Sequence, residues 1–115
     1  MYTVYAIPNC DTVKKARTWL AENGIAYQFH DYKKQGLDRA TIDRWLTQKS
    51  WPELVNRAGA TWKKLPDADK PTNAEEAVVL MREKTSVIRR PLIEYEGEII
   101  ALGFNADDYA KVFSV

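Results

Sequence analysis

The sequence predicts a single α/β domain in which a small mixed β-sheet is interrupted by a helical insert. Three observations support this fold class. A β-α-β pattern fills the first third of the chain, helical periodicity with cap signals occupies about 37–85, and the last third holds a strand pair followed by a helix. At 115 residues the chain has the length of one domain, so residues 1–115 are expected to share one modest core.

The first third of the chain alternates strand and helix. An apolar, β-branched run predicts a strand over 2–7, which Pro8-Asn9 ends, and a helix is expected over about 10–22. The stop signal Asn23-Gly24 ends this helix, and alternation of apolar and polar residues over 25–32 predicts a second strand. Two strands joined by one helix are most simply parallel.

The middle of the chain predicts helices with identifiable caps. Asp38 is expected to cap one helix, and Ser50-Trp51-Pro52-Glu53 has the spacing of a capping box at the start of a second. A loop or broken helix is expected over 56–65, after which Thr72 is expected to cap a third helix. These helices are expected to form an insert within the domain.

The last third returns to β-structure. Two apolar runs, 91–95 and 98–101, flank the turn dipeptide Glu96-Gly97 and predict a β-hairpin. Asn105 is expected to cap a closing helix. The inner face of that helix is expected to carry Tyr109, Val112 and Phe113. The order β-α-β, helical insert, β-β-α is that of a thioredoxin-like fold.

Composition excludes several classes of function. A net charge of +1 gives no reason to expect nucleic acid or a membrane surface as a partner. No apolar run approaches the roughly 18 residues of a membrane span, and the N-terminus lacks a signal-peptide pattern. One cysteine and one histidine form neither an internal disulfide nor a zinc site, and no nucleotide fingerprint is present. We expect a cytoplasmic monomer with no bound cofactor or metal.

The only cysteine, Cys10, lies where the first strand ends and the first helix begins. A thiol at this position faces unpaired backbone N–H groups and the positive end of the helix dipole, which both favour the reactive thiolate. Asp11 opposes this effect, because a neighbouring carboxylate disfavours thiolate. A lone cysteine is also commonly a small buried apolar side chain. Cys10 is therefore a candidate nucleophile, with a structural role as the alternative.

Basic residues are expected near Cys10 from two parts of the chain. At 100° per residue, Lys14 and Arg17 lie on the same stripe of the first helix as Cys10, where they attract an anion or form a solvated face. Arg90 precedes Pro91, and in a thioredoxin-like plan this proline is typically cis and lies beside the cysteine. Arg90 then reaches the thiolate, where its planar guanidinium group is suited to bind an oxyanion or a carboxylate. The alternative is that Arg89 and Arg90 form a basic pair on the surface at the end of a loop.

Together these motifs resemble the arsenate reductase-like (ArsC/Spx) family. The resemblance rests on Pro8-Asn9-Cys10, on the run from Lys14 to Leu20, on Ile88 to Ile93, and on Gly103-Phe104-Asn105 before the last helix. It covers the full chain and is closest to the YffB-type branch, which is proposed to contain glutathione-dependent thiol reductases. It implies a thioredoxin-like fold with an inserted helical subdomain.

The resemblance also implies roles for particular residues. Cys10 matches the family's catalytic cysteine, which attacks arsenate or reacts with glutathione. Arg90 matches the arginine before the family proline, which helps to bind the oxyanion, and Arg57 falls where glutathione-linked arsenate reductases carry another such arginine. The expected site comprises Cys10 as nucleophile, Arg90, Arg57, Pro91 and Asn9 in substrate or glutathione binding, and Lys14 and Arg17 in support.

Two departures from the family pattern narrow the predicted function. A third arginine of arsenate reductases falls near Phe104-Asn105, where this chain has none, which argues against arsenate as the natural substrate. Spx-type regulators carry Cys-x-x-Cys, whereas Val13 excludes an internal disulfide switch here. We therefore predict an oxidoreductase, a glutathione-dependent thiol reductase with glutathione as co-substrate and a small-molecule or protein thiol as substrate. The alternatives are an Spx-like regulator that binds RNA polymerase without catalysis, and a true arsenate reductase.

Overall fold

The computed structural model describes residues 1–115, which divide into two compact units. The first unit comprises Met1–Gln35 together with Arg90–Val115, and the second comprises Gly36–Arg89. The segment interpreted as a helical insert, about 37–85, falls within the second unit. The candidate nucleophile Cys10 belongs to the first.

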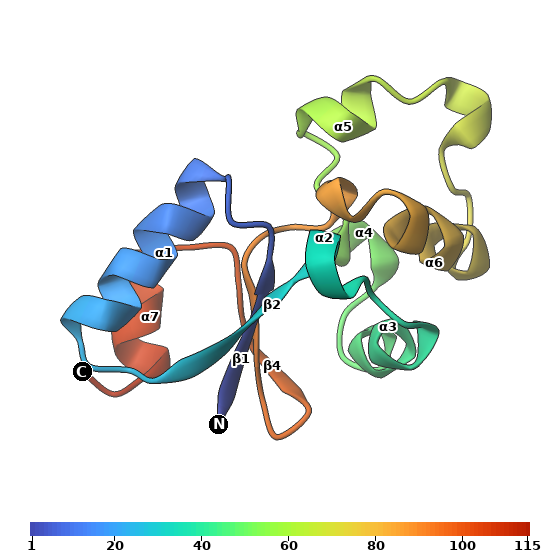
Figure 1. Ribbon diagram of the computed structural model, residues 1–115. Helices are drawn as coiled ribbons and strands as arrows, with labels where there is room; N and C mark the ends of the chain where they lie inside the picture. The colour runs from blue at the N-terminus through green and yellow to red at the C-terminus, as the bar shows by residue number, and fades with distance from the viewer. The chain divides into compact units, whose positions relative to one another are not determined.

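A four-stranded mixed sheet with strand order β2-β1-β3-β4 forms the centre of the first unit (Figure 1). Its strands are β1 (Tyr2–Ala6), β2 (Tyr27–Asp31), β3 (Leu92–Tyr95) and β4 (Glu98–Leu102). β1 pairs in parallel with β2 and antiparallel with β3, and β3 and β4 form an antiparallel hairpin. Glu96 and Gly97 close this hairpin with φ values of 50° and 82°, as a tight turn between two strands requires. The predicted parallel pair and hairpin are confirmed.

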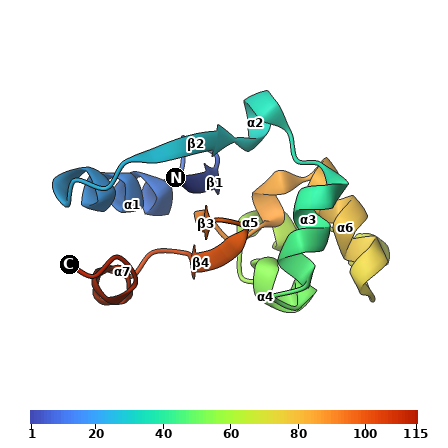
Figure 2. The same ribbon diagram turned by 90° about the horizontal axis from the view of Figure 1, so that it is seen from below.

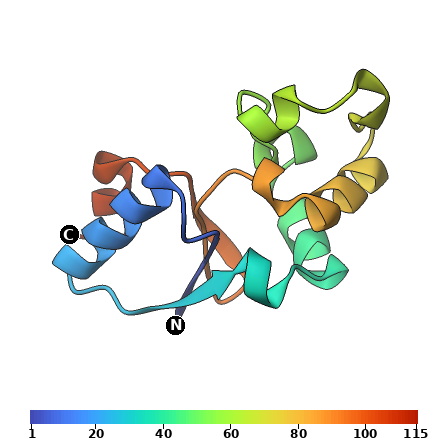
Figure 3. The same ribbon diagram turned by 45° about the horizontal axis from the view of Figure 1, so that its top comes forward.

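Two helices, α1 (Asp11–Glu22) and α7 (Ala106–Val112), pack against one face of this sheet. Figures 1 and 3 show both helices on the same side of the strands. The core between them consists of Val4, Ala16, Leu20, Ile93, Tyr109 and Phe113. Because Val4 and Ile93 point to this face, their neighbours Tyr5 and Glu94 point to the opposite one.

Two details of the first unit correct the sequence-based expectations. The second strand ends at Asp31, where its pairing with Ala6 ends, and Tyr32 begins the short helix α2 (Tyr32–Gln35). The expected strand over 25–32 is therefore too long at both ends. Val112 is 41% exposed and does not join the inner face of α7, which buries Tyr109; Phe113, the residue after α7, is buried as well. Asn105 caps α7 as predicted, since its side chain accepts a hydrogen bond from the Asp108 N–H at 3.0 Å.

The second unit is helical. Its elements are α3 (Arg39–Leu46), α4 (Trp51–Leu54), α5 (Ala60–Lys63), α6 (Ala74–Glu83) and the 3₁₀ turns η1 (Asp67–Asp69) and η2 (Thr85–Val87) (Figure 2). Asp38 caps α3 as predicted, accepting from the Thr41 N–H at 2.8 Å, and Ser50 and Glu53 form the predicted capping box of α4. None of the chain's helices is long and apolar enough to cross a membrane.

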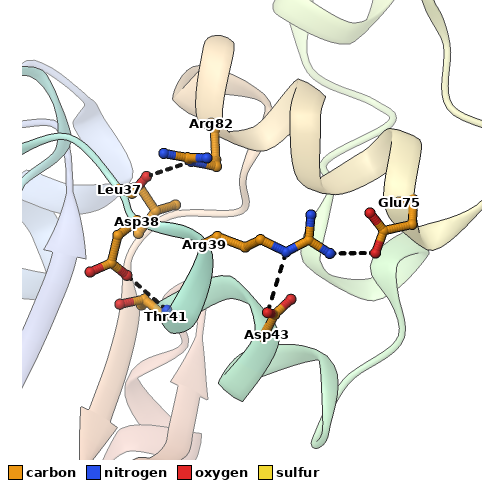
Figure 4. Close-up of polar contacts among 7 residues, drawn as sticks. All are labelled: Leu37, Asp38, Arg39, Thr41, Asp43, Glu75 and Arg82. Carbon is orange, nitrogen blue, oxygen red and sulfur yellow. Dashed lines mark hydrogen bonds and ion pairs between the residues drawn. The ribbon is translucent and has the colours of Figure 1, made fainter.

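Polar contacts join the two longest helices of the second unit, α3 and α6 (Figure 4). The Arg39 guanidinium pairs with the Glu75 carboxylate of α6 and, at 3.4 Å, with Asp43 of its own helix. Arg82 of α6 donates from Nε to the Leu37 carbonyl at 3.2 Å, just before α3 begins. The two ion pairs of Arg39 are exposed to solvent, so each contributes little to stability.

The cap of α6 differs by one residue from the expectation. Asn73 is the N-cap, and its side chain accepts from the Glu76 N–H at 2.9 Å. Thr72 instead donates to the Glu76 carboxylate from its backbone N–H at 2.7 Å and from its hydroxyl at 2.8 Å. Thr72 and Asn73 are both good cap residues, and only the final backbone conformation selects between them.

Candidate functional site

The strand pairing brings three chain segments to one end of the sheet. β1 and β2 are parallel and end together at Ala6 and Asp31, while the antiparallel β3 begins there with Leu92 opposite Tyr5. Cys10 therefore follows β1, Tyr32 follows β2 and Arg90 precedes β3 at the same end of the sheet. Residues that are far apart in the sequence therefore lie at the same end of the sheet.

Cys10 is the N-cap residue of α1. Its backbone is extended, with φ −147° and ψ 127°, and its carbonyl accepts the first helical hydrogen bond from the Lys14 N–H at 2.9 Å. The side chain is partly exposed and makes no capping hydrogen bond as a thiol, yet the N–H groups of Thr12 and Val13 face the sulfur. The first turn of the helix thus supplies N–H donors that stabilise a thiolate more than a thiol, whose sulfur is a weak acceptor.

The pKa of the Cys10 thiol lies below its ordinary value. Partial burial acts against this and would raise the pKa, but the Val13 N–H, the Arg90 guanidinium and the Thr12 N–H together outweigh it. Arg90 acts both as a hydrogen-bond donor to the sulfur and through its positive charge. Thiolate character at lower pH makes Cys10 a better nucleophile than a free cysteine.

Arg90 is held at this position by the start of β3. The Arg90-Pro91 peptide bond is cis, as predicted, and the Pro91 carbonyl accepts from the Gly103 N–H at 2.8 Å. Pro91 is buried and Arg90 partly exposed. The structure thus brings the predicted Arg90 to Cys10.

Arg17 has different partners from those expected. Its Nε donates to the Tyr27 hydroxyl at 2.9 Å, and its guanidinium lies 4.1 Å from the centre of the Phe29 ring. These contacts direct Arg17 toward the side chains of β2. A supporting role of Arg17 at Cys10 stays a prediction.

The remaining predicted site residues are exposed. Asn9 directly precedes Cys10, and Lys14 lies one turn into α1. Arg57 lies in the loop between α4 and α5, within the second compact unit. The roles of Asn9 and Arg57 in substrate or glutathione binding, and of Lys14 in support, stay predictions.

Sequence reasoning missed three polar residues of the first unit. Tyr5 and Glu94 are 8% and 5% exposed, and the Tyr5 hydroxyl donates to Glu94 Oε1 at 3.0 Å. Tyr32 is 2% exposed, and its ring stacks on that of Tyr5 with the centroids 6.3 Å apart. The available signal was Glu94, a carboxylate in the middle of a strand that otherwise reads as apolar, because a buried charge demands polar partners.

The lowered pKa of Cys10 predicts a pH-dependent stability. Thiolate formation stabilises the folded state fully above the unfolded-state pKa, near 9.0, and this contribution is lost as the pH falls through the lower folded-state pKa. Wild type should therefore gain stability relative to Cys10→Ser as the pH rises toward 9.0. Urea unfolding of both proteins from neutral to alkaline pH measures this, and parallel profiles would mean that the fold does not favour the thiolate.

The fold and the site define a class of protein: a thioredoxin-like sheet with one cysteine at the start of its first helix, paired with an arginine before a cis-proline. Comparison with known families gives the particular family. The chain belongs to the ArsC family, whose family model matches residues 5–112.

Similar proteins cover almost the whole chain. An uncharacterised protein of Haemophilus influenzae is 39% identical over 99% of this chain and 100% of its own. The solved structure of a protein named YffB is 44% identical, with a TM-score of 0.90, covering 97% of this chain and 98% of the other. An arsenate reductase-related protein of Brucella melitensis is 45% identical, with a TM-score of 0.79, covering 99% and 95%. The global transcriptional regulator Spx of Streptococcus mutans is 27% identical over 94% of this chain and 80% of its own.

Proposed function

We propose that this ArsC-family protein is a glutathione-dependent thiol reductase that uses Cys10 as its nucleophile. The observation that carries the proposal is the contact between Arg90 and the Cys10 sulfur at the start of α1. A cysteine buried only for packing would have no need of a cationic donor. A partly exposed thiol with a lowered pKa has the properties of a nucleophile.

The chemistry requires an external thiol, because the chain contains one cysteine. In the first step the Cys10 thiolate attacks the glutathione sulfur of a mixed disulfide, forming a Cys10–glutathione disulfide and releasing the substrate as a thiolate. In the second step a glutathione thiolate attacks that disulfide, releasing oxidised glutathione and restoring the Cys10 thiolate. The two steps together consume one free glutathione thiol for each mixed disulfide, and they yield oxidised glutathione and the free substrate thiol. Arg90, with its planar fork, is suited to hold a carboxylate of the bound tripeptide.

The direct test is formation of the Cys10–glutathione disulfide. Wild-type protein incubated with oxidised glutathione should gain one glutathionyl group by intact-mass spectrometry. Reduced glutathione should then remove it, and the protein should catalyse reduction of the mixed disulfide of glutathione and β-mercaptoethanol. NADPH consumption in the presence of glutathione reductase measures that turnover.

The matched control is Cys10→Ser, which retains a polar N-cap side chain of similar size and lacks the thiol. It should form no adduct and show no turnover above background. Absence of both adduct and turnover in wild type at millimolar glutathione would overturn the proposal. Turnover retained by Cys10→Ser would exclude Cys10 as the nucleophile.

The similarity to Spx favours one second candidate, a regulatory protein that binds RNA polymerase without catalysis. Val13 replaces the second cysteine of a Cys-x-x-Cys switch, so such a regulator could not respond through an internal disulfide. Co-purification of polymerase subunits with both wild type and Cys10→Ser would favour the regulator. Binding that is absent from both proteins would leave the reductase as the only candidate of the two.

A further inference from the structure

Arg17 of α1 is held in place by two aromatic side chains of β2. Its Nε donates to the Tyr27 hydroxyl at 2.9 Å, and the central carbon of its guanidinium lies 4.1 Å from the centre of the Phe29 ring. The same carbon lies 5.8 Å from the centre of the Tyr27 ring. All three side chains are partly buried, so these contacts restrict the rotation of an otherwise flexible side chain.

The guanidinium of Arg17 is positively charged, yet its partners in the protein are a neutral hydroxyl and two aromatic rings. Arg17 makes no other hydrogen bond and no ion pair within the protein. The N–H donors of its two terminal amino groups are therefore available to a ligand. The group that matches this planar pair of donors is a carboxylate, which binds an arginine through two parallel hydrogen bonds.

Arg17 and Cys10 lie on the same side of α1. Two turns of helix separate them, which corresponds to about 10 Å along the axis. Because β2 is parallel to β1, Phe29 lies nearer than Tyr27 to the end of the sheet where Cys10 follows β1. The guanidinium lies over Phe29, on the Cys10 side of its hydrogen bond to Tyr27. A molecule joined to the Cys10 sulfur can therefore extend along this side of α1 to Arg17.

We propose that Arg17 is a specificity-determining residue, which binds a carboxylate about 10 Å from the disulfide that Cys10 attacks. An extended peptide advances about 3.4 Å per residue, so an Asp or Glu three residues from the substrate cysteine reaches Arg17. The preferred substrates are then peptide or protein mixed disulfides with an acidic residue at this spacing. This inference rests on the proposed function, because it assumes that Cys10 attacks a disulfide.

The test measures the first chemical step alone, with peptides that each carry one cysteine as its 2-pyridyl disulfide. The Cys10 thiolate attacks the sulfur of the peptide cysteine, forms a Cys10–peptide disulfide and releases pyridine-2-thiolate, which takes up a proton to become the thione. The absorbance of the thione gives the second-order rate constant. The peptides have Glu or Gln three residues before or after the cysteine and are otherwise identical and neutral.

In at least one of the two orientations, wild type should react about fivefold faster with the Glu peptide than with the Gln peptide, as expected for a well-formed but solvent-accessible ion pair. Arg17→Met should lose this preference and react with the Gln peptide at the wild-type rate. Arg17→Gln should behave in the same way, because it keeps a donor for the Tyr27 hydroxyl and removes only the charge. Wild type with no preference in either orientation, or a variant that keeps the preference, would overturn the proposal.

Lys15→Met is the matched control. It removes one positive charge from an exposed position of α1 that faces away from the side shared by Cys10 and Arg17. This variant should keep the full preference for the Glu peptide. Loss of the preference in Lys15→Met as well would mean that the net charge of α1, and not the position of Arg17, selects the acidic peptide, which would overturn the proposal.

Glutathione also carries carboxylates, so its own 2-pyridyl disulfide is included as a separate substrate. Arg17→Met should react with it at the wild-type rate, and a fivefold loss confined to this substrate would assign Arg17 to glutathione and overturn the proposal. Reaction with peptides that depends on Arg17, without turnover of glutathione, would refute the proposed function and leave the role of Arg17 standing. Glutathione turnover without a preference for the Glu peptides would do the reverse.

Discussion

Arg90→Met is expected to raise the pKa of the Cys10 thiol toward that of a free cysteine. It removes the hydrogen bond and the positive charge that favour the thiolate, while the N–H groups of Val13 and Thr12 remain. A higher pKa leaves less thiolate at neutral pH, so alkylation by iodoacetamide should be slower than in wild type. The alkylation rate as a function of pH, followed by mass spectrometry, measures both quantities.

Arg89→Met is the control for this variant. It makes the same change in side chain and net charge one residue earlier, where Arg89 is exposed and its Nε donates to the Glu53 carbonyl at 3.1 Å. Its alkylation profile should match wild type. Arg90→Lys should lie between wild type and Arg90→Met, because lysine keeps the charge without the planar fork. Identical profiles for Arg90→Met and Arg89→Met would remove the electrostatic basis of the proposed site.

Ile93→Ala is expected to destabilise the protein by about 2–5 kcal/mol, the usual cost of removing a large aliphatic side chain from a core. Ile93 is fully buried in β3 and packs with Val4, Leu20 and Tyr109. These partners come from β1, α1 and α7, so they cannot all move to fill the space. Urea unfolding followed by far-UV circular dichroism measures the change in the free energy of unfolding.

Val112→Ala provides the comparison for this core substitution. Val112 lies in α7 with 41% of its surface exposed, so the change should fall within about 0.5 kcal/mol of wild type. A loss for Ile93→Ala no greater than that for Val112→Ala would mean that the sheet and its two helices do not share the core described. The stability of the site depends on this core, because β1, α1 and β3 together position Cys10 and Arg90.

Local signals in the sequence predicted most of the elements. Asp38, Asn105 and the Ser50–Glu53 pair were correctly assigned as caps, because a cap acts on N–H groups within three residues of itself. The errors arose where two local solutions were nearly equivalent or where pairing decided the boundary. Thr72 and Asn73 are both suitable caps, and the end of the second strand depends on where β1 stops.

In the candidate site, too, local signals were predicted from the sequence and contacts between distant segments were not. Cys10 was found by its position before a helix, which is a local property. Its partner Arg90 is eighty positions away and was assigned through the thioredoxin-like plan and the family resemblance. Tyr5 and Glu94, which are 89 positions apart, had no such guide, and their hydrogen bond was missed. Arg17 was placed correctly on α1, but the sequence contained no sign that Tyr27 and Phe29 would hold its guanidinium.

The sequence by itself determined that this protein has one thiol, that the thiol precedes a helix, and that any disulfide cycle must use an external thiol. Only the tertiary structure decided which side chains surround that thiol. Strand register sets these neighbours, because the parallel β1–β2 pair and the antiparallel β1–β3 pair bring Cys10, Tyr32 and Arg90 to one end of the sheet. Such contacts depend on the pairing of distant segments, and no property of a single segment specifies them.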